Sequence, residues 1–149
     1  INKVTNILKS RGIEAKVYSN VKPDPTDEEI IEGMLELSAY DPDCIIALGG
    51  GSPIDACKSM IYFTNQIKRA MGQNKKPKFI AIPTTSGTGS EVTSYAVVTT
   101  KDKKIPLSDS EMLPDIAILN PEPNSVNPLI ASRRFSETSV RILSGLYIR

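Results

Sequence analysis

Histidine is absent from all 149 residues of the sequence. Histidine is the general base of Ser-His-Asp and Cys-His catalytic groups, and it is the commonest protein ligand of zinc and iron. This chain alone therefore cannot build either catalytic group, and a metal site made only from its residues would need carboxylate or thiolate ligands. We assign no catalytic residue and no metal ligand in this sequence.

Cysteine, net charge and long apolar runs are also scarce. The two cysteines, Cys44 and Cys57, do not form a Cys-x-x-Cys pair, and no secretory signal or run of about 18 apolar residues occurs. The net charge is +1, with both signs interspersed, which argues against nucleic acid or a membrane surface as a partner. We expect a cytoplasmic protein with reduced thiols.

What the sequence does contain is the alternating pattern of an α/β domain of ordinary size. The apolar periodicity predicts helices at 1–10, 27–39 and 53–65, and strands at 13–18, 44–48, 78–82 and 115–119. Strands that alternate with helices predict a parallel sheet with right-handed crossovers. Segments 95–100 and 104–108 flank a short polar turn and predict a β-hairpin beside the sheet.

Two of these elements carry specific side-chain expectations. In the first strand, the alternation places Ile13, Ala15 and Val17 on the buried side and Tyr18 on the other. In the second helix, Thr26 and Glu29 have the spacing of a capping box. We expect four residues of that helix to face the core: Ile30, Ile31, Met34 and Leu37.

The stretch 45–55, with the sequence IIALGGGSPID, is the feature around which the rest of the chain is organised. A buried strand ends on three glycines, which allow a ligand to approach the backbone closely. We predict that Ser52 caps the next helix, with Pro53 at its first position and Asp55 at its third. The unpaired amides of a helix start form an anion site, although the same glycines would also suit a plain strand-to-helix turn. The pattern is neither a G-x-G-x-x-G fingerprint nor a P-loop, because Lys58 stands too far along.

A second loop, 84–91, follows the strand predicted at 78–82 and is dense in hydroxyl groups and glycine. Ligands of open α/β sheets bind beyond the carboxyl ends of the strands, so we interpret this loop as a wall of a binding site rather than a flexible linker. On the residues alone, Glu91 is an exposed loop carboxylate, Cys57 a core residue and Lys104 a solvated lysine of the hairpin.

Two segments at this spacing, ALGGGSPID at 47–55 and AIPTTSGTGSEVT at 81–93, closely resemble the iron-containing, group III alcohol dehydrogenases. Segments 21–26 and 114–122 are similar to further parts of that family, so the resemblance covers residues 1 to about 130. In overall character the sequence is most similar to bacterial propanol and ethanol dehydrogenases. The zinc-dependent glycerol dehydrogenases are an alternative branch, but the loop at 84–93 fits the iron branch better.

The resemblance implies a Rossmann-like N-terminal domain of the dehydroquinate synthase type that binds NAD or NADP, followed in the family by a helical domain that supplies the iron ligands. It also implies that the glycine loop holds the cofactor pyrophosphate, that four threonines line its adenosine and ribose, and that Lys104 contacts the cofactor. The residues carried over are Gly49, Gly50, Gly51, Ser52, Thr84, Thr85, Thr88, Thr93 and Lys104.

The departures from the family are equally informative. The family begins with a strand ending in an Asp that selects the adenine ribose, and this chain starts after it, so the choice between NAD and NADP cannot be predicted. Beyond 126–131 the sequence no longer matches the metal-binding helix. We therefore expect residues 1–130 to form a cofactor-binding domain without its first strand, and 131–149 to be a divergent tail, for which a frameshift is one explanation.

The function we predict is the cofactor-binding part of an iron-dependent alcohol dehydrogenase, which acts on a small alcohol or aldehyde by hydride transfer. We expect this fragment, truncated at both ends, to bind nucleotide weakly and to turn over no alcohol. The alternative is a non-enzymatic nucleotide-binding or assembly module, including a homodimer, that pairs through the sheet edge where the first strand is missing.

Overall fold

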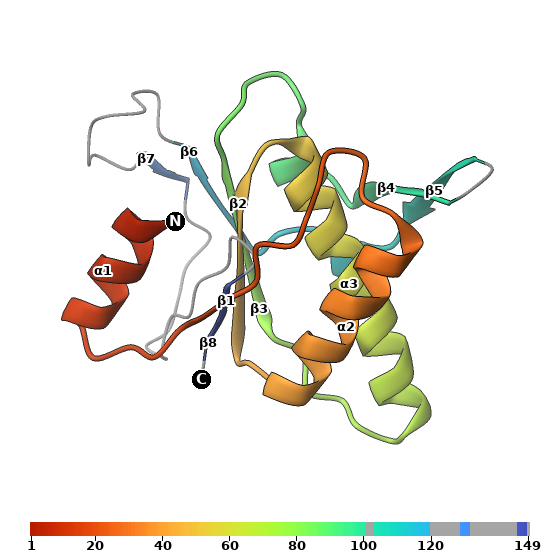
Figure 1. Cartoon of the computed structure of the whole chain (residues 1–149), viewed down its shortest axis with the longest axis horizontal. Coiled ribbons are helices and arrows are strands. Elements are labelled where there is room, and N and C mark those ends of the chain that lie inside the picture. The colour runs from red at the N-terminus through yellow and green to blue at the C-terminus, as the bar shows by residue number, and fades with distance from the viewer. Residues whose placement is uncertain (101–102, 120–128, 132–145, 149) are drawn as a thin grey trace.

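The computed structural model describes residues 1–100 and 103–119, together with the backbone of 129–131 and 146–148. Its sheet of six strands has the order β1-β8-β2-β3-β6-β7, and a separate hairpin is formed by β4 and β5. Figure 1 shows α2 and α3 together on one side of the sheet and α1 on the other. The helices are α1 (Asn2–Ser10), α2 (Asp27–Tyr40) and α3 (Gly51–Ala70), with short 3-10 turns η1 (Ser90–Val92) and η2 (Ser110–Met112). The strands are β1 (Lys16–Val17), β2 (Cys44–Gly49), β3 (Lys78–Pro83), β4 (Tyr95–Thr99), β5 (Lys104–Ser108), β6 (Ile116–Leu119), β7 (Leu129–Ala131) and β8 (Leu146–Ile148).

The centre of the sheet is parallel, which confirms the predicted α/β class. Strand β2 pairs with β3 over six positions, from Cys44 opposite Lys78 to Gly49 opposite Pro83, and β3 pairs with β6 in the same direction. The side chains of Cys44 to Ala47 are buried, as in a strand covered on both faces. The hairpin of β4 and β5 is also confirmed, with Tyr95 opposite Ser108. Strands β7 and β8 are antiparallel to their neighbours.

The first strand is shorter than predicted and does not lie next to β2. It spans Lys16–Val17 and pairs with β8, which lies between it and β2. The backbone of Ile13 is unavailable for the sheet, because its amide donates to the carbonyl of Leu8 at 3.0 Å. Val17 is 41% exposed and Tyr18 is buried, with its hydroxyl donating to the Glu29 carbonyl, so the predicted alternation is wrong at this end.

The C-terminal tail contributes a strand to the sheet at 146–148. The sheet edge proposed for assembly is therefore paired: β8 bonds to both β1 and β2. Segments 120–128 and 132–145 lie outside the described residues, and the second of these makes up most of the predicted divergent tail, 131–149.

Helix α2 begins with the predicted capping box. The Thr26 hydroxyl accepts a hydrogen bond from the Glu29 amide at 3.3 Å, and the Glu29 carboxylate accepts one from the Thr26 amide at 3.2 Å. Ile30 and Leu37 are buried as predicted, whereas Ile31 is 52% exposed. The error arises because adjacent helical residues lie about 100° apart, so Ile31 turns away from the face of Ile30 and Leu37.

Helix α3 begins two residues earlier than the sequence suggests and ends later. Gly50, with the extended dihedrals φ −77° and ψ −164°, is its N-cap, so Ser52 lies inside the first turn and Asp55 in the second. Gly50 can take the cap position because its carbonyl already accepts from the Ile54 amide at 3.4 Å. The helix continues past Asn65 to Ala70, because Lys68 in its last turns is held by Asp41.

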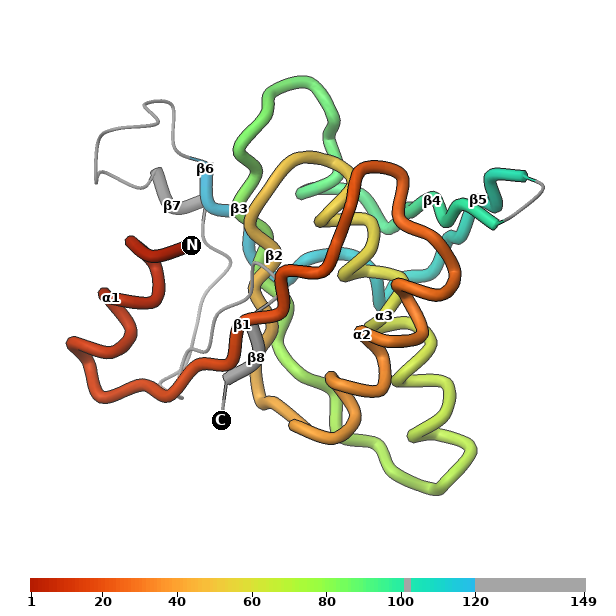
Figure 2. Tube along the Cα trace, in the orientation of Figure 1, coloured from red at the N-terminus to blue at the C-terminus, as the bar shows by residue number. Residues whose placement is uncertain are grey.

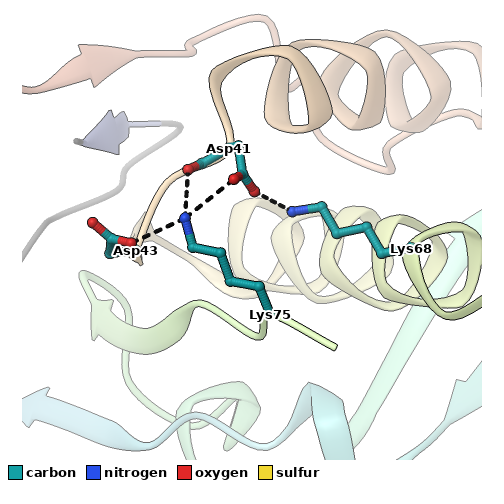
Figure 3. A network of polar contacts seen from close by, with 4 residues as sticks. All are labelled: Asp41, Asp43, Lys68 and Lys75. Carbon is teal, nitrogen blue, oxygen red and sulfur yellow. Dashed lines mark hydrogen bonds and ion pairs between the residues drawn. The ribbon is translucent and has the colours of Figure 1, made fainter. Parts of the chain in front are cut away.

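A network of ion pairs joins the ends of α2 and α3 at the start of β2 (Figure 3). Asp41, the C-cap of α2, pairs with Lys68 and also accepts from Lys75 at 3.1 Å, and Lys75 contacts Asp43 at 3.0 Å. The hydrogen bond from Lys68 lowers the pKa of Asp41. Since β2 runs from this network toward Gly49, the network lies at the opposite end of the sheet from the glycine loop.

Candidate functional site

Two loops follow the neighbouring parallel strands β2 and β3: the glycine loop, residues 49–52, and the hydroxyl loop, residues 84–91. They therefore emerge at the same end of the sheet. Their first residues are tied together, because the Thr84 amide donates to the Gly49 carbonyl at 2.8 Å. Figure 2 follows the chain through both turns, which lie at one end of the sheet above β2 and β3. This arrangement agrees with the expectation that both loops border one site beyond the strand ends.

The three glycines leave little room for a side chain, and Gly49 leaves least. A Cβ on Gly49, whose φ is 156°, would lie 2.8 Å from Cγ of Pro53. A Cβ on Gly50 would lie 3.1 Å from Oγ1 of Thr85, and one on Gly51 would lie 3.3 Å from Cγ2 of Thr88. The first glycine thus allows the tight entry into α3, and the other two allow the hydroxyl loop to approach the start of that helix.

The start of α3 has no side-chain cap and no acidic residue in its first turn. Its first amides therefore carry the positive end of the helix dipole without an acidic residue of the first turn to oppose it. The Ser52 hydroxyl accepts a contact from the Asp24 amide at 3.5 Å, which brings the turn at 23–25 next to the glycine loop. Such a helix start can receive an anionic ligand group.

Lys104 is placed at the border of the same region by Asp24. Its Nζ atom lies 2.6 Å from the Asp24 carboxylate, and both side chains are well exposed. The turn is held against the hairpin because the Thr99 amide donates to the Pro25 carbonyl at 3.1 Å. The structure thus brings Lys104 toward Ser52 through Asp24, rather than leaving it as a lysine far out on the hairpin.

Thr93 is linked to a residue that the sequence analysis did not select as functional. Lys58 of α3 has no exposed surface, and its Nζ atom donates to Oγ1 of Thr93 at 3.1 Å and to the Tyr95 carbonyl at 2.8 Å. The burial of Lys58 could have been predicted from the sequence. Lys58 follows Ile54 by four residues and precedes Ile61 by three, so it lies on the apolar face of the helix.

Three further polar groups lie close to this lysine. Burial raises the pKa of Asp55, although a hydrogen bond from Ser90 and the nearby charge of Lys58 both act to lower it. Its Oδ1 atom has no hydrogen-bond partner among the described residues, and the same is true of Oε2 of Glu91. Glu91 is only partly exposed, which corrects its description as an exposed loop carboxylate. Cys57 is buried in the core as predicted, and burial raises the pKa of its thiol.

Metal coordination was tested on the same residues. Within the part of the chain that the structure describes, no three His, Cys, Asp or Glu side chains lie together so that they could hold a metal ion. The described residues therefore do not fit an iron site. Nor is any described helix both long enough and apolar enough to cross a membrane.

The fold is a Rossmann-like α/β domain in which two loops follow β2 and β3 at the same end of the sheet, and comparison with known proteins identifies its family. Residues 1–121 match the family described as iron-containing alcohol dehydrogenase, and the chain belongs to that family. It is 40% identical over 134 residues to an NADPH-dependent butanol dehydrogenase of Clostridium saccharobutylicum, covering 82% of this chain and 34% of the relative. It is 44% identical over 108 residues to the 1-propanol dehydrogenase PduQ of Salmonella typhimurium, covering 71% of this chain and 28% of the relative.

Solved structures agree with this assignment. The iron-containing alcohol dehydrogenase of Thermococcus thioreducens superposes with a TM-score of 0.66 at 29% identity, over 79% of this chain and 35% of that one. The NADH-dependent butanol dehydrogenase A of Thermotoga maritima superposes with a TM-score of 0.67 at 26% identity, over 80% and 32%. The chain therefore spans about a third or less of the length of these relatives.

Proposed function

We propose that this chain binds a nicotinamide dinucleotide, NAD or NADP, between the glycine loop and the hydroxyl loop. One observation carries the proposal: the uncapped start of α3 lies against the hydroxyl loop so closely that a Cβ on Gly50 would be 3.1 Å from the Thr85 hydroxyl. Helix amides and glycine backbone on one side and threonine hydroxyls on the other suit a pyrophosphate with its adjoining ribose.

The proposed contacts follow from this placement. Gly49, Gly50, Gly51 and Ser52 hold the pyrophosphate, and Thr84, Thr85, Thr88 and Thr93 line the adenosine and ribose. All four threonines are exposed. The Thr93 hydroxyl accepts from Lys58 and therefore keeps its own proton for donation to a ligand.

Lys104 supplies a cation at the border of the site. Its ion pair with Asp24 is exposed, and exposed pairs contribute only about 0–1 kcal/mol. Exchange of Asp24 for a cofactor phosphate or ribose therefore costs little. A dinucleotide at this position supplies or accepts a hydride at its nicotinamide ring. The residues of this chain bind and orient the cofactor.

We also propose that residues 1–130 are the cofactor-binding part of the enzyme and that this chain alone turns over no alcohol, since the described residues offer no group of metal ligands. The relatives, a butanol dehydrogenase and a 1-propanol dehydrogenase, support small primary alcohols or their aldehydes as the substrate of a complete enzyme. They favour this branch over the glycerol dehydrogenases.

Calorimetric titration of the purified 149-residue chain tests the proposal. NADH, NADPH and ADP-ribose are expected to bind, whereas adenosine, which lacks the pyrophosphate, is expected to bind far more weakly. Equal binding of adenosine would refute the assignment of the glycine loop. Absence of heat with every nucleotide, combined with dimers on a sizing column, would support the assembly module instead.

A parallel assay addresses turnover. The chain is incubated with ferrous iron, NAD and 1-propanol, and NADH is followed by its absorbance. We expect no sustained production. Continued NADH formation that remains proportional to the amount of chain through a second purification step would contradict the proposed lack of activity.

A further inference from the structure

Helix α3 carries two buried lysines, and they face opposite ends of the domain. Lys68 lies near its C-terminus and pairs with Asp41 in the network of Figure 3. Lys58 lies in its N-terminal half, has no exposed surface, and donates to Thr93 and to the Tyr95 carbonyl. Both acceptors of Lys58 belong to the segment that leads from the hydroxyl loop into β4.

Burial of Lys58 is not explained by packing. The helix face around it is apolar, with Ile54 and Ile61 fully buried. A methionine would fill such a position without the desolvation cost of a cation. That cost is reflected in the lowered pKa of Lys58, which burial depresses and the nearby Asp55 and Glu91 partly restore. The lysine therefore has a role that an apolar side chain could not fill.

The contacts of Lys58 identify that role. The hydroxyl loop is tied at its start by the bond from the Thr84 amide to Gly49. At its other end, the Ser90 side chain hydrogen-bonds to Asp55 of α3. Thr93, three residues after Ser90, accepts a hydrogen bond from Lys58 of the same helix. Asp55 and Lys58 lie one turn apart on α3, so the helix that starts at the glycine loop also anchors the far end of the hydroxyl loop.

We propose that Lys58 is a positioning residue for the nucleotide site: it holds the hydroxyl loop at a fixed distance from the glycine loop, without contacting the ligand itself. The inference rests on the proposed function. Without this anchor, the loop bearing Thr85 and Thr88 would keep its attachment at Gly49 and its link through Ser90, but it would lose the side-chain contact that holds Thr93. A ligand would then have to order the loop as it binds, which weakens affinity.

The test compares Lys58→Met with Lys68→Met, a matched change of a buried lysine on the same helix, in the complete 149-residue chain. ADP-ribose affinity is measured by calorimetry, and hydrogen exchange is measured for amides 84–95 without ligand. We expect Lys58→Met to weaken binding by about tenfold or more, on the scale of other supporting residues around a site. It should also speed exchange in 84–95, whereas Lys68→Met changes neither.

A second variant and a pH series separate positioning from general stability. Lys58→Gln keeps amide donors and is the alternative if the methionine variant does not fold. Between pH 7 and 10 the wild type should lose affinity as Lys58 deprotonates beside Asp55, Cys57 and Glu91. Lys58→Gln should show a smaller change, and Lys68→Met should follow the wild type. Wild-type affinity in both Lys58 variants would overturn this inference alone, whereas a wild type that binds no ADP-ribose would overturn the proposed function.

Discussion

Alanine substitutions in the glycine loop separate its two roles, the entry into α3 and the contact with a ligand. At Gly49, alanine would combine an unfavourable φ of 156° with a Cβ placed 2.8 Å from the Pro53 ring. Backbone strain of this kind costs about 1–3 kcal/mol, and overpacking costs a similar amount. Gly49→Ala should therefore lower the free energy of unfolding by about 2–6 kcal/mol, a large share of the stability of a small domain.

At Gly50 the same change should leave stability nearly unaltered. The dihedrals of Gly50 are extended and suit alanine, which gains about 0.4–1 kcal/mol from a less flexible unfolded chain. The new Cβ lies 3.1 Å from the hydroxyl of Thr85, an exposed side chain that can shift by a few tenths of an ångström. The two effects should nearly cancel. Binding should nevertheless weaken by about tenfold, equivalent to about 1.4 kcal/mol, because the methyl group stands between the loops.

The assay is urea unfolding followed by circular dichroism, together with calorimetric titration of ADP-ribose. Gly72→Ala is the control: Gly72 has a φ of 75° and no atom within 4 Å of an added Cβ, so it reports backbone strain away from the site. It should lose about 1 kcal/mol or more of stability and bind as the wild type does. Wild-type affinity in Gly50→Ala would refute the pyrophosphate assignment, and wild-type stability in Gly49→Ala would refute the steric argument.

Three other changes test the supporting structure. Thr26→Ala removes the hydroxyl that caps α2 and should cost about 1 kcal/mol in urea unfolding; an unchanged midpoint would show that the capping box contributes nothing. The hydrogen bond from Lys68 lowers the pKa of Asp41, so the stability that ionised Asp41 contributes is complete above the normal aspartate pKa of about 4 and is lost as the pH falls through the lowered value. Stability measured from pH 6 down to pH 2 should therefore fall less steeply in Asp41→Asn than in the wild type, and equal slopes would exclude this contribution. Burial should keep Cys57 from reacting with a thiol reagent at pH 8 until urea unfolds the chain, and rapid labelling of the native chain would contradict its place in the core.

Features encoded by short-range signals could be predicted from the sequence. The capping box at Thr26 depends on residues three apart, and the central strands β2 and β3 are continuous apolar runs ended by glycine or proline. The predicted start of α3 is wrong because Ser52 and Pro53 form a good local cap signal, while the extended Gly50 takes the cap position two residues earlier. Local preferences cannot rank two nearby cap positions when the neighbouring loop packs on one of them.

Long-range pairing carried no local signal. Nothing in 146–148 indicates that this segment pairs with both β1 and β2. The placement of the two loops was predicted better than the sheet edge, because parallel strands necessarily bring their carboxyl ends together once β2 and β3 are recognised. What could not be predicted was how the hydroxyl loop is held, since that depends on a side chain of α3 meeting a segment 35 residues later.

The two buried lysines of α3 show why composition alone could not locate the functional end of the domain. Lys68 and Lys58 are both lysines on a mostly buried helix, and both have oxygen acceptors. Lys68 meets a carboxylate that is 41% exposed, in an ion pair that joins two helix ends. Lys58 meets a hydroxyl and a carbonyl, and its nearest carboxylates keep unpaired oxygens within the described residues. A cation buried without a fully matched anion is costly, and such costs concentrate where a protein holds a site rather than where it only holds its fold. This criterion supports our proposal that the nucleotide site lies at the glycine-loop end of α3.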